Sequence, residues 1–310
     1  MAKPRRTAFH LAVYCLVRLL SALVQALPLP AAYGFAGRVA QIAAVINRRH
    51  RRVAEENLRH AFGVSLSDNQ RRRMVLAVYE HFGKLLVEFL HLPRRFRGAN
   101  AKRFFEHANL RTALRQVLGE RRPTIVVGAH HGNWEVASVL LAAVDLRAFA
   151  VARTLDNPYL HRFFLRLRQF NGQTILSKNE DYDRIRQVLA DDGILCMLAD
   201  QSGGPRGYFV DFFGRLASTQ RAVALLALEY NARVIVTYTR RLTDSFYYEV
   251  GVESLLDPRD YQQERDGAWR LTADMTAALE RSIRRAPEQY FWLHNRWKLA
   301  PPTRKHRAAA

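Results

Sequence analysis

Hydrophobic and polar positions divide the chain into two stretches with different periodicity. Up to about residue 120, apolar residues recur at helical spacing. The clearest helix starts with a capping box formed by Ser67 and Gln70, carries apolar positions from Met74 to Phe89, and should end at Pro93. From Thr124 onward, short apolar runs alternate with amphipathic segments. Expected strands cover residues 124–129, 148–152, 174–176, 194–198, 234–238 and 246–250, and expected helices cover residues 134–143, 158–170, 182–190, 219–230 and 269–285. This alternation predicts an α/β fold, a largely parallel twisted sheet flanked by helices, with its active site at the strand ends.

The N-terminal segment suggests a membrane. Residues 9–27 are apolar except for His10, Arg18, Ser21 and Gln25. Arg18 argues against a signal peptide, and it would cost a full span roughly 2.5 kcal/mol or more. We expect a helix lying in or dipping into the bilayer surface; a single span and a buried core helix are the alternatives. The basic run at residues 48–52 would contact anionic headgroups or form a solvated helix face, and it keeps the body of the protein cytoplasmic.

These patterns give an expected domain organisation. Residues 1–46 form an N-terminal apolar, membrane-associating segment. Residues 47–300 form one domain, helical to about residue 120 and α/β from about residue 121, and residues 301–310 form a loose tail.

Charge and cysteine content narrow the function. The chain has 48 Lys and Arg against 28 Asp and Glu, a net charge of +20, which predicts a polyanionic partner. A nucleic acid is not expected, because no recognisable reader module accompanies the basic residues and the apolar N-terminus would be unexplained. Cys15 and Cys196 form neither a disulfide framework nor a metal pattern, which fits a reducing compartment.

The segment 124–135, TIVVGAHHGNWE, holds the candidate chemistry. A buried strand should end at Ala129 and a helix should begin near Asn133, which places His130 on the exposed turn between them. Glu135, in the first helical turn, is expected to approach one imidazole nitrogen and leave the other free to take a proton. His131 is an alternative base, and a purely structural histidine is the alternative to both. No third ligand at metal spacing accompanies the two histidines, so no metal is expected.

Residues 128–135 resemble the histidine-x4-glutamate block of the lipid A late acyltransferase family, within the lysophospholipid acyltransferase superfamily. Further blocks occur in family order: the apolar N-terminus, an Arg-rich stretch, residues 55–58 and Glu88, residues 153–158 with Arg168 and Gly172, residues 198–201, residues 207–214 with Ser218 and Thr219, and residues 292–298. The resemblance runs from about residue 10 to residue 300. His131, Asp211 and the pair Ala222-Val223 depart from the family pattern and leave the acceptor and the acyl-chain length open.

The resemblance implies a glycerolipid-acyltransferase-like fold and an O-acyltransferase. His130 would be the general base and Glu135 its partner, with direct transfer, no acyl-enzyme, and neither metal nor redox cofactor. The acyl chain would move from an acyl carrier protein or coenzyme A thioester to a hydroxyl of a membrane glycolipid or lipid. Lipid A-type late acylation is expected, and a lysophospholipid or phosphoglycolipid acceptor, a lipid hydrolase and an inactive membrane scaffold are the alternatives. The location would be the cytoplasmic face of the bacterial inner membrane, monotopic or with a single N-terminal anchor.

Several other residues are candidates for substrate binding. Arg153 and Arg168 would bind a substrate phosphate or the phosphopantetheine of the donor, or else form surface salt bridges. Asn157 is a further candidate that could instead cap a helix, and Asp200 and Gln201 could instead form a turn. Phe212 and Phe213 are expected to line an acyl groove, with core packing as the alternative.

Overall fold

The structure is a computed structural model that describes residues 4–96, 103–108, 119–143, 146–178 and 180–301. Its centre is a seven-stranded sheet in the order β1-β9-β8-β2-β5-β3-β4. The strands are β1 (Phe105–Ala108), β2 (Thr124–Gly128), β3 (Ala148–Ala152), β4 (Thr174–Ser177), β5 (Ile194–Leu198), β8 (Arg233–Thr243) and β9 (Tyr247–Leu256). The five strands from β8 to β4 are mutually parallel, and β9 runs antiparallel to β8. The predicted α/β fold with a largely parallel sheet is confirmed.

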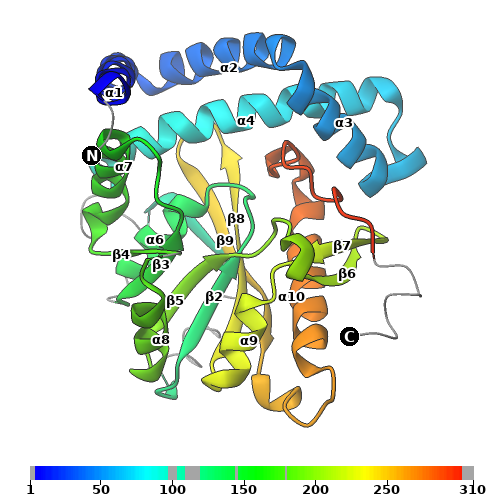
Figure 1. The fold of residues 1–310 in the computed structure, drawn as a ribbon. Coiled ribbons are helices and arrows are strands. Elements are labelled where there is room, and N and C mark those ends of the chain that lie inside the picture. The colour runs from blue at the N-terminus through cyan, green and yellow to red at the C-terminus, as the bar shows by residue number, and fades with distance from the viewer. Residues whose placement is uncertain (1–3, 97–102, 109–118, 144–145, 179, 302–310) are drawn as a thin grey trace.

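Helices cover both faces of the sheet. One face packs against α8 (Tyr182–Ala190), α9 (Ala222–Glu229) and α10 (Gly267–Arg285). The other face packs against α4 (Asp68–Arg95), α6 (Trp134–Ala143) and α7 (Pro158–Arg168). The apolar faces of the helices are thereby buried against the strands, and α4 runs across the carboxyl ends of the central strands (Figure 1).

The N-terminal helices form an outer layer. In Figure 1, α2 (Leu29–Ile46) lies along α4, α1 (Pro4–Ala26) crosses one end of it, and α3 (Arg48–Phe62) follows at the other end. The helix α2 buries Ala32, Tyr33, Ala40 and Ala44 against the body, and its other side is exposed. Both α1 and α2 are long and apolar enough to cross a membrane, by length and composition alone. Only 6% of the apolar window in α1 and 28% of that in α2 are buried.

The structure differs from the sequence predictions at several elements. β1 lies in the stretch that was expected to be helical, and it pairs in parallel with β9 at the edge of the sheet. The hairpin β6 (Tyr208–Phe212) and β7 (Arg215–Thr219) was not predicted, and the helix expected from residue 219 begins only at Ala222. The hairpin turn is Phe213-Gly214, with φ of 57° and 74°, a two-residue turn that usually carries Asn-Gly or Asp-Gly.

Pro93 does not end its helix. The capping box at Ser67 and Gln70 is present as predicted, but α4 continues through Pro93 to Arg95. A proline in the last turn removes only one intrahelical hydrogen bond, so the packing of the helix against the sheet outweighs it. Residues 302–310 of the expected loose tail lie outside the described residues.

Candidate active site

The register of two neighbouring strands brings a histidine and an aspartate together. Gly128, the last residue of β2, is paired with Leu198, the last residue of β5. His130 and Asp200 each follow two residues later, and the Ala199 amide donates to the Gly128 carbonyl, which keeps the two chains side by side. Both side chains therefore meet where the parallel strands end, the position at which ligands bind in such sheets.

The two side chains form a hydrogen-bonded pair. Nδ1 of His130 lies 2.8 Å from Oδ1 of Asp200. The Asp200 side chain is 2% exposed and the His130 side chain 24% exposed, so the carboxylate is enclosed behind the ring. Burial lowers the pKa of His130, but the adjacent Asp200 carboxylate and, more weakly, Glu135 outweigh it and raise that pKa above its usual value. Asp200 is itself desolvated, yet its contact with His130 holds the pKa of the carboxyl below its usual range.

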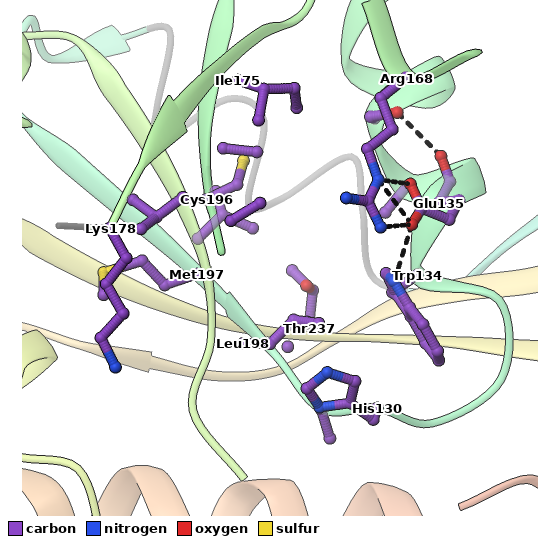
Figure 2. A pocket seen from close by; sticks show the side chains of 18 of the residues that line it. His130, Trp134, Glu135, Arg168, Ile175, Lys178, Cys196, Met197, Leu198 and Thr237 are labelled. Atoms are coloured by element: carbon purple, nitrogen blue, oxygen red, sulfur yellow. Dashed lines mark hydrogen bonds and ion pairs between the residues drawn. The ribbon is translucent and has the colours of Figure 1, made fainter. Parts of the chain in front are cut away.

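Contrary to the prediction from the sequence, Glu135 is not the hydrogen-bonding partner of His130. Its carboxylate Oε1 instead accepts from Nε and Nη2 of Arg168 at 3.0 and 2.7 Å, and from Nε1 of Trp134 at 3.2 Å. Figure 2 shows this ion pair on one wall of the site, with Trp134 between it and His130. The helix direction explains the difference, because the first turn of α6 points Glu135 toward the end of α7, where Arg168 lies.

His130, Glu135 and Arg168 line a cavity of about 820 Å³ at the carboxyl ends of the central strands, bordered by α6 on one face of the sheet and by α8 and α9 on the other. Its volume is within the range of about 300–1,000 Å³ that small-molecule and cofactor sites commonly have. Small side chains make the space: Gly128, Ala150, Ala152 and Cys196 on the strands, and Ala137 and Ser138 on α6. Apolar residues, Val126, Leu141, Ile175, Met197 and Leu198, form much of the remaining wall. Burial raises the pKa of the Cys196 thiol to about 12, so this thiol is a neutral part of the wall rather than a nucleophile.

The other predicted site residues fall into two groups. Arg153 and Gln201 line the same cavity. Asn157 does not: its Oδ1 caps α7 through the amides of Tyr159 and Leu160, and its Nδ2 donates to the His10 carbonyl of α1.

Phe212 and Phe213 are also outside the cavity lining. They are 1% and 4% exposed and pack in the core, where their rings contact Trp297 and Trp292 respectively. The structure therefore favours the core-packing interpretation of these residues over the predicted acyl groove.

His131 is separated from His130 in environment as well as in direction. It is 3% exposed, and its Nε2 lies 3.0 Å from the Ala286 carbonyl oxygen. Burial lowers its pKa to about 4, so the ring is neutral and structural. His131 also borders the cavity, but Nδ1 of His130 is the imidazole nitrogen paired with a carboxylate.

Asp200 was a candidate for substrate binding, and its pairing with His130 was not predicted. The two residues are 70 positions apart, and β3 and β4 intervene between β2 and β5 in the chain. One signal was available: each residue lies two positions past the end of an apolar strand. It predicts a contact only if the two strands are known to be neighbours in the sheet. Among the residues that the structure describes, no three His, Cys, Asp or Glu side chains gather as a metal ion would require.

Comparison with known proteins identifies a family. The model of the bacterial lipid A biosynthesis acyltransferases matches residues 2–299. The lipid A biosynthesis lauroyltransferase of Escherichia coli is 26% identical over 285 residues, which is 90% of this chain and 89% of that protein. The palmitoleoyltransferase of lipid A biosynthesis from the same organism is 24% identical over 278 residues, 89% of this chain and 87% of that protein. A phosphatidylinositol mannoside acyltransferase of Mycolicibacterium smegmatis is 28% identical over 123 residues, 38% of this chain and 40% of that protein.

Proposed function

The chain belongs to the bacterial lipid A biosynthesis acyltransferase family, and on that premise we propose that it transfers a fatty acyl chain from an acyl thioester to a hydroxyl of a lipid A precursor, with His130 as general base. Its relatives are acyltransferases, and the chain is an acyltransferase that acts on a lipid. The observation that carries the finer proposal is the His130–Asp200 pair at a cavity large enough for an acyl chain.

The reaction follows from the two ring nitrogens. The Asp200 carboxylate accepts a hydrogen bond from Nδ1–H and thereby fixes the tautomer in which Nε2 is unprotonated. Nε2 takes the proton of the acceptor hydroxyl as its oxygen attacks the thioester carbonyl, and the imidazolium that forms is stabilised by the Asp200 carboxylate. When the tetrahedral intermediate collapses, the carbon–sulfur bond breaks and the imidazolium returns the proton to the leaving thiolate. The acyl chain passes directly to the acceptor oxygen, so no acyl-enzyme forms.

The Glu135–Arg168 pair has a different part in this proposal from the one expected from the sequence. Because Glu135 binds the guanidinium through Nε and Nη2, it fixes the orientation of Arg168 on the cavity wall. The Arg168 side chain remains 31% exposed, so Nη1 is available to a substrate oxygen, either the developing oxyanion or a phosphate. Glu135 therefore acts in two ways: it orients Arg168, and its negative charge helps to raise the pKa of His130.

The acyl chain would occupy the cavity that His130 borders at the strand ends. The wall there is apolar, and the small side chains Gly128, Ala150 and Ala152 leave the space open. Arg153 and Lys178 also line this cavity, and they are placed to contact phosphates of the thioester donor. The net charge of +20 suits an acidic acyl carrier protein better than free coenzyme A, because complementary charge speeds the encounter of two proteins.

The N-terminal layer would hold the enzyme at the cytoplasmic face of the bacterial inner membrane. The helix α1 is attached along α7: the Asn157 amide donates to the His10 carbonyl, and Arg18 lies 5.1 Å from the Phe163 ring centroid. Arg18 thus faces α7 and Tyr14, to which it donates at 3.0 Å. A helix attached to the body along several turns supports the surface-lying arrangement, with α1 and α2 buried in the lipid interface, over a single span.

The acceptor is the least constrained part of the proposal. The relatives that match most of the chain are named for lipid A biosynthesis, which favours a lipid A precursor. The shorter match to a phosphatidylinositol mannoside acyltransferase makes a phosphoglycolipid the second candidate.

Reconstituted transfer tests the proposal. Purified full-length protein would be given an acyl-carrier-protein or coenzyme A thioester, with a lipid A precursor, a phosphoglycolipid or no acceptor. We expect acylated lipid A precursor by mass spectrometry, faster turnover with the carrier protein, and an intact protein mass unchanged in the absence of acceptor. A thioester consumed at the same rate without acceptor would indicate a hydrolase, and a protein mass increased by one acyl group would overturn direct transfer.

A further inference from the structure

A buried charged cluster lies between α4 and the turn that carries His130. Glu88 of α4 is 0% exposed and Arg241 of β8 is 8% exposed. Arg241 donates from Nε to Oε1 of Glu88 at 2.5 Å and from Nη2 to Oε2 at 3.0 Å. Tyr33 of α2 donates to the same carboxylate at 2.9 Å. The ionised pair is therefore enclosed and its oxygens are satisfied by several donors.

One arm of this cluster reaches the turn through a side chain. Nδ2 of Asn133 donates to Oε2 of Glu88 at 2.7 Å. Asn133 stands immediately before α6, where an asparagine often caps the helix, but its side-chain oxygen is buried without a partner among the described residues and so caps nothing. The amide is directed to Glu88 instead of to the helix, which indicates that the contact with Glu88 determines the conformation of this residue.

The second arm reaches the backbone of the turn. Nη1 of Arg241 lies 2.8 Å from Nδ1 of His81, and Nε2 of His81 lies 3.1 Å from the Gly132 carbonyl oxygen. Because a guanidinium only donates, Nδ1 of His81 must accept and Nε2 must carry the proton. Burial and the Arg241 charge lower the pKa of His81 well below its usual value, in agreement with a neutral ring. Arg241 therefore orients His81, and His81 holds the Gly132 carbonyl.

The turn needs such support because its backbone is constrained. Gly132 has a φ of +59°, and a Cβ there would lie 1.4 Å from the Thr239 carbonyl oxygen. Its amide donates to the Gln289 carbonyl, and the His130 carbonyl accepts from the Phe291 amide. A left-handed residue pressed against a strand persists only when its surroundings determine it.

We propose that Glu88 and Arg241 are positioning residues for His130. Through Asn133 and His81 they fix the conformation of the turn 130–133, and thereby the orientation of the imidazole toward the cavity. A buried ion pair is weak evidence for a role in stability, since apolar residues of the same volume often do as well. Two separate hydrogen-bonded arms that converge on the turn are better explained by a positional role. Tyr33 extends the same network to α2, the helix whose other side is exposed and apolar.

The inference rests on the proposed role of His130, and its test separates the two. Glu88→Gln keeps the shape of the side chain but removes the charge, and Glu88→Gln with Asn133→Asp exchanges donor and acceptor and restores both the hydrogen bond and the net charge. Glu253→Gln is the matched control, because Glu253 is a 5% exposed carboxylate bound by Arg281 and Arg285 on the other side of the sheet.

Two quantities are measured on the full-length enzyme in each variant: hydrogen exchange of the amides of residues 130–133, and kcat and KM for acyl transfer. We expect Glu88→Gln to speed exchange in the turn by about tenfold or more, since it loses hydrogen bonds to a charged group. It should lower kcat with little change in KM, the double variant should recover both properties, and Glu253→Gln should alter neither.

A second pair of variants covers the case in which Glu88→Gln does not fold. His81→Leu removes the donor to Gly132. His91→Leu removes a buried histidine of the same helix whose Nδ1 bonds to the Val87 carbonyl and whose ring packs against Phe246, away from the turn. Only the first should speed exchange in the turn. Unchanged exchange in both Glu88→Gln and His81→Leu would overturn the inference. Faster exchange with an unchanged kcat would show that the cluster stabilises the turn, and it would count against His130 as the base.

Discussion

At the scale of single residues, the proposed mechanism assigns different roles to the imidazole of His130 and to two carboxylates. Asp200, enclosed and 2.8 Å from Nδ1, is the residue that fixes the tautomer. Glu135 is held by Arg168 and contributes charge from further away. His131, next in the sequence, is buried and neutral. Adjacent residues thus have different roles because the turn directs one ring into the cavity and the other into the core.

Asp200→Asn tests this division of roles. The substitution removes the charge that raises the pKa of His130, so the acid limb of the kcat/KM profile should move to lower pH. Because the imidazolium of the transition state loses its anionic partner and the tautomer is no longer enforced, kcat at neutral pH should fall by about 10²- to 10⁴-fold. The measurement is the pH dependence of acyl transfer; a profile and a rate that match the wild type would exclude Asp200 from the mechanism.

The residue scale also shows how far the sequence could be used. The block at residues 128–135 led to His130 and to its place on a strand-to-helix turn. It did not reveal Asp200 as the partner, because the contact depends on β5 lying beside β2, and strand order in a sheet does not follow chain order. Phe212 and Phe213 illustrate a second reason: an aromatic run fits a core and an acyl groove equally well by composition, and only packing separates them.

At the scale of elements, the hydrophobic periodicity of the sequence predicted most ends of the α/β helices and strands to within a residue or two. Helices α6 and α8 and strands β3 and β5 have the bounds expected from the sequence. The hairpin β6–β7 was missed because its turn is Phe213-Gly214, which lacks the usual hairpin residues, and β1 was missed because a four-residue edge strand carries little periodic signal. The cavity is likewise an element-scale property, since its lining combines small residues of neighbouring strands with residues of α6, α8 and α9.

Enlarging one of those small residues should shorten the acyl chain that the enzyme accepts. Ala150 lies on β3 in the cavity wall, and the series Ala150→Val, Ala150→Leu and Ala150→Phe fills progressively more of the space. Each methylene excluded from an apolar pocket costs roughly 1–3 kcal/mol in specificity, so kcat/KM should fall by tenfold or more for the longest donors and stay near wild type for short ones. Competition between acyl thioesters of different length gives the measurement. An equal fall for all lengths would mean that the chain does not occupy this cavity.

At the scale of the whole molecule, more than half of the large apolar side chains that are exposed among the described residues lie on the N-terminal layer. On α1 they include Leu16, Leu19 and Leu23, and on α2 they include Ile42 and Val45. This layer lies next to the candidate site: α2 packs on α4 (Figure 1), and His81 of α4 contacts the turn that carries His130. An exposed apolar layer of this extent is unusual on a soluble monomer and fits insertion into a lipid interface.

Replacing exposed leucines of this layer should release the enzyme from membranes without unfolding it. Leu19→Ser, Leu23→Ser and Ile42→Ser together remove apolar surface that the body does not bury. With about 1.5–3 kcal/mol for each side chain fully inserted, binding to anionic vesicles should weaken by at least about 100-fold. The control combines Leu216→Ser, Leu225→Ser and Leu255→Ser, which are exposed elsewhere on the body and should leave vesicle binding unchanged. Equal losses in both sets would contradict a specific membrane face.

The central claim is that the imidazole of His130, and not that of His131, accepts the proton of the lipid hydroxyl. The most direct measurement is the rate of acyl transfer by His130→Ala and His131→Phe, with circular dichroism and thermal unfolding to verify that both variants fold. We expect His130→Ala to lower turnover by at least about 10²-fold, the contribution usual for a general base, and His131→Phe to stay within about tenfold of the wild type. A folded His130→Ala enzyme with near-normal turnover would contradict the claim.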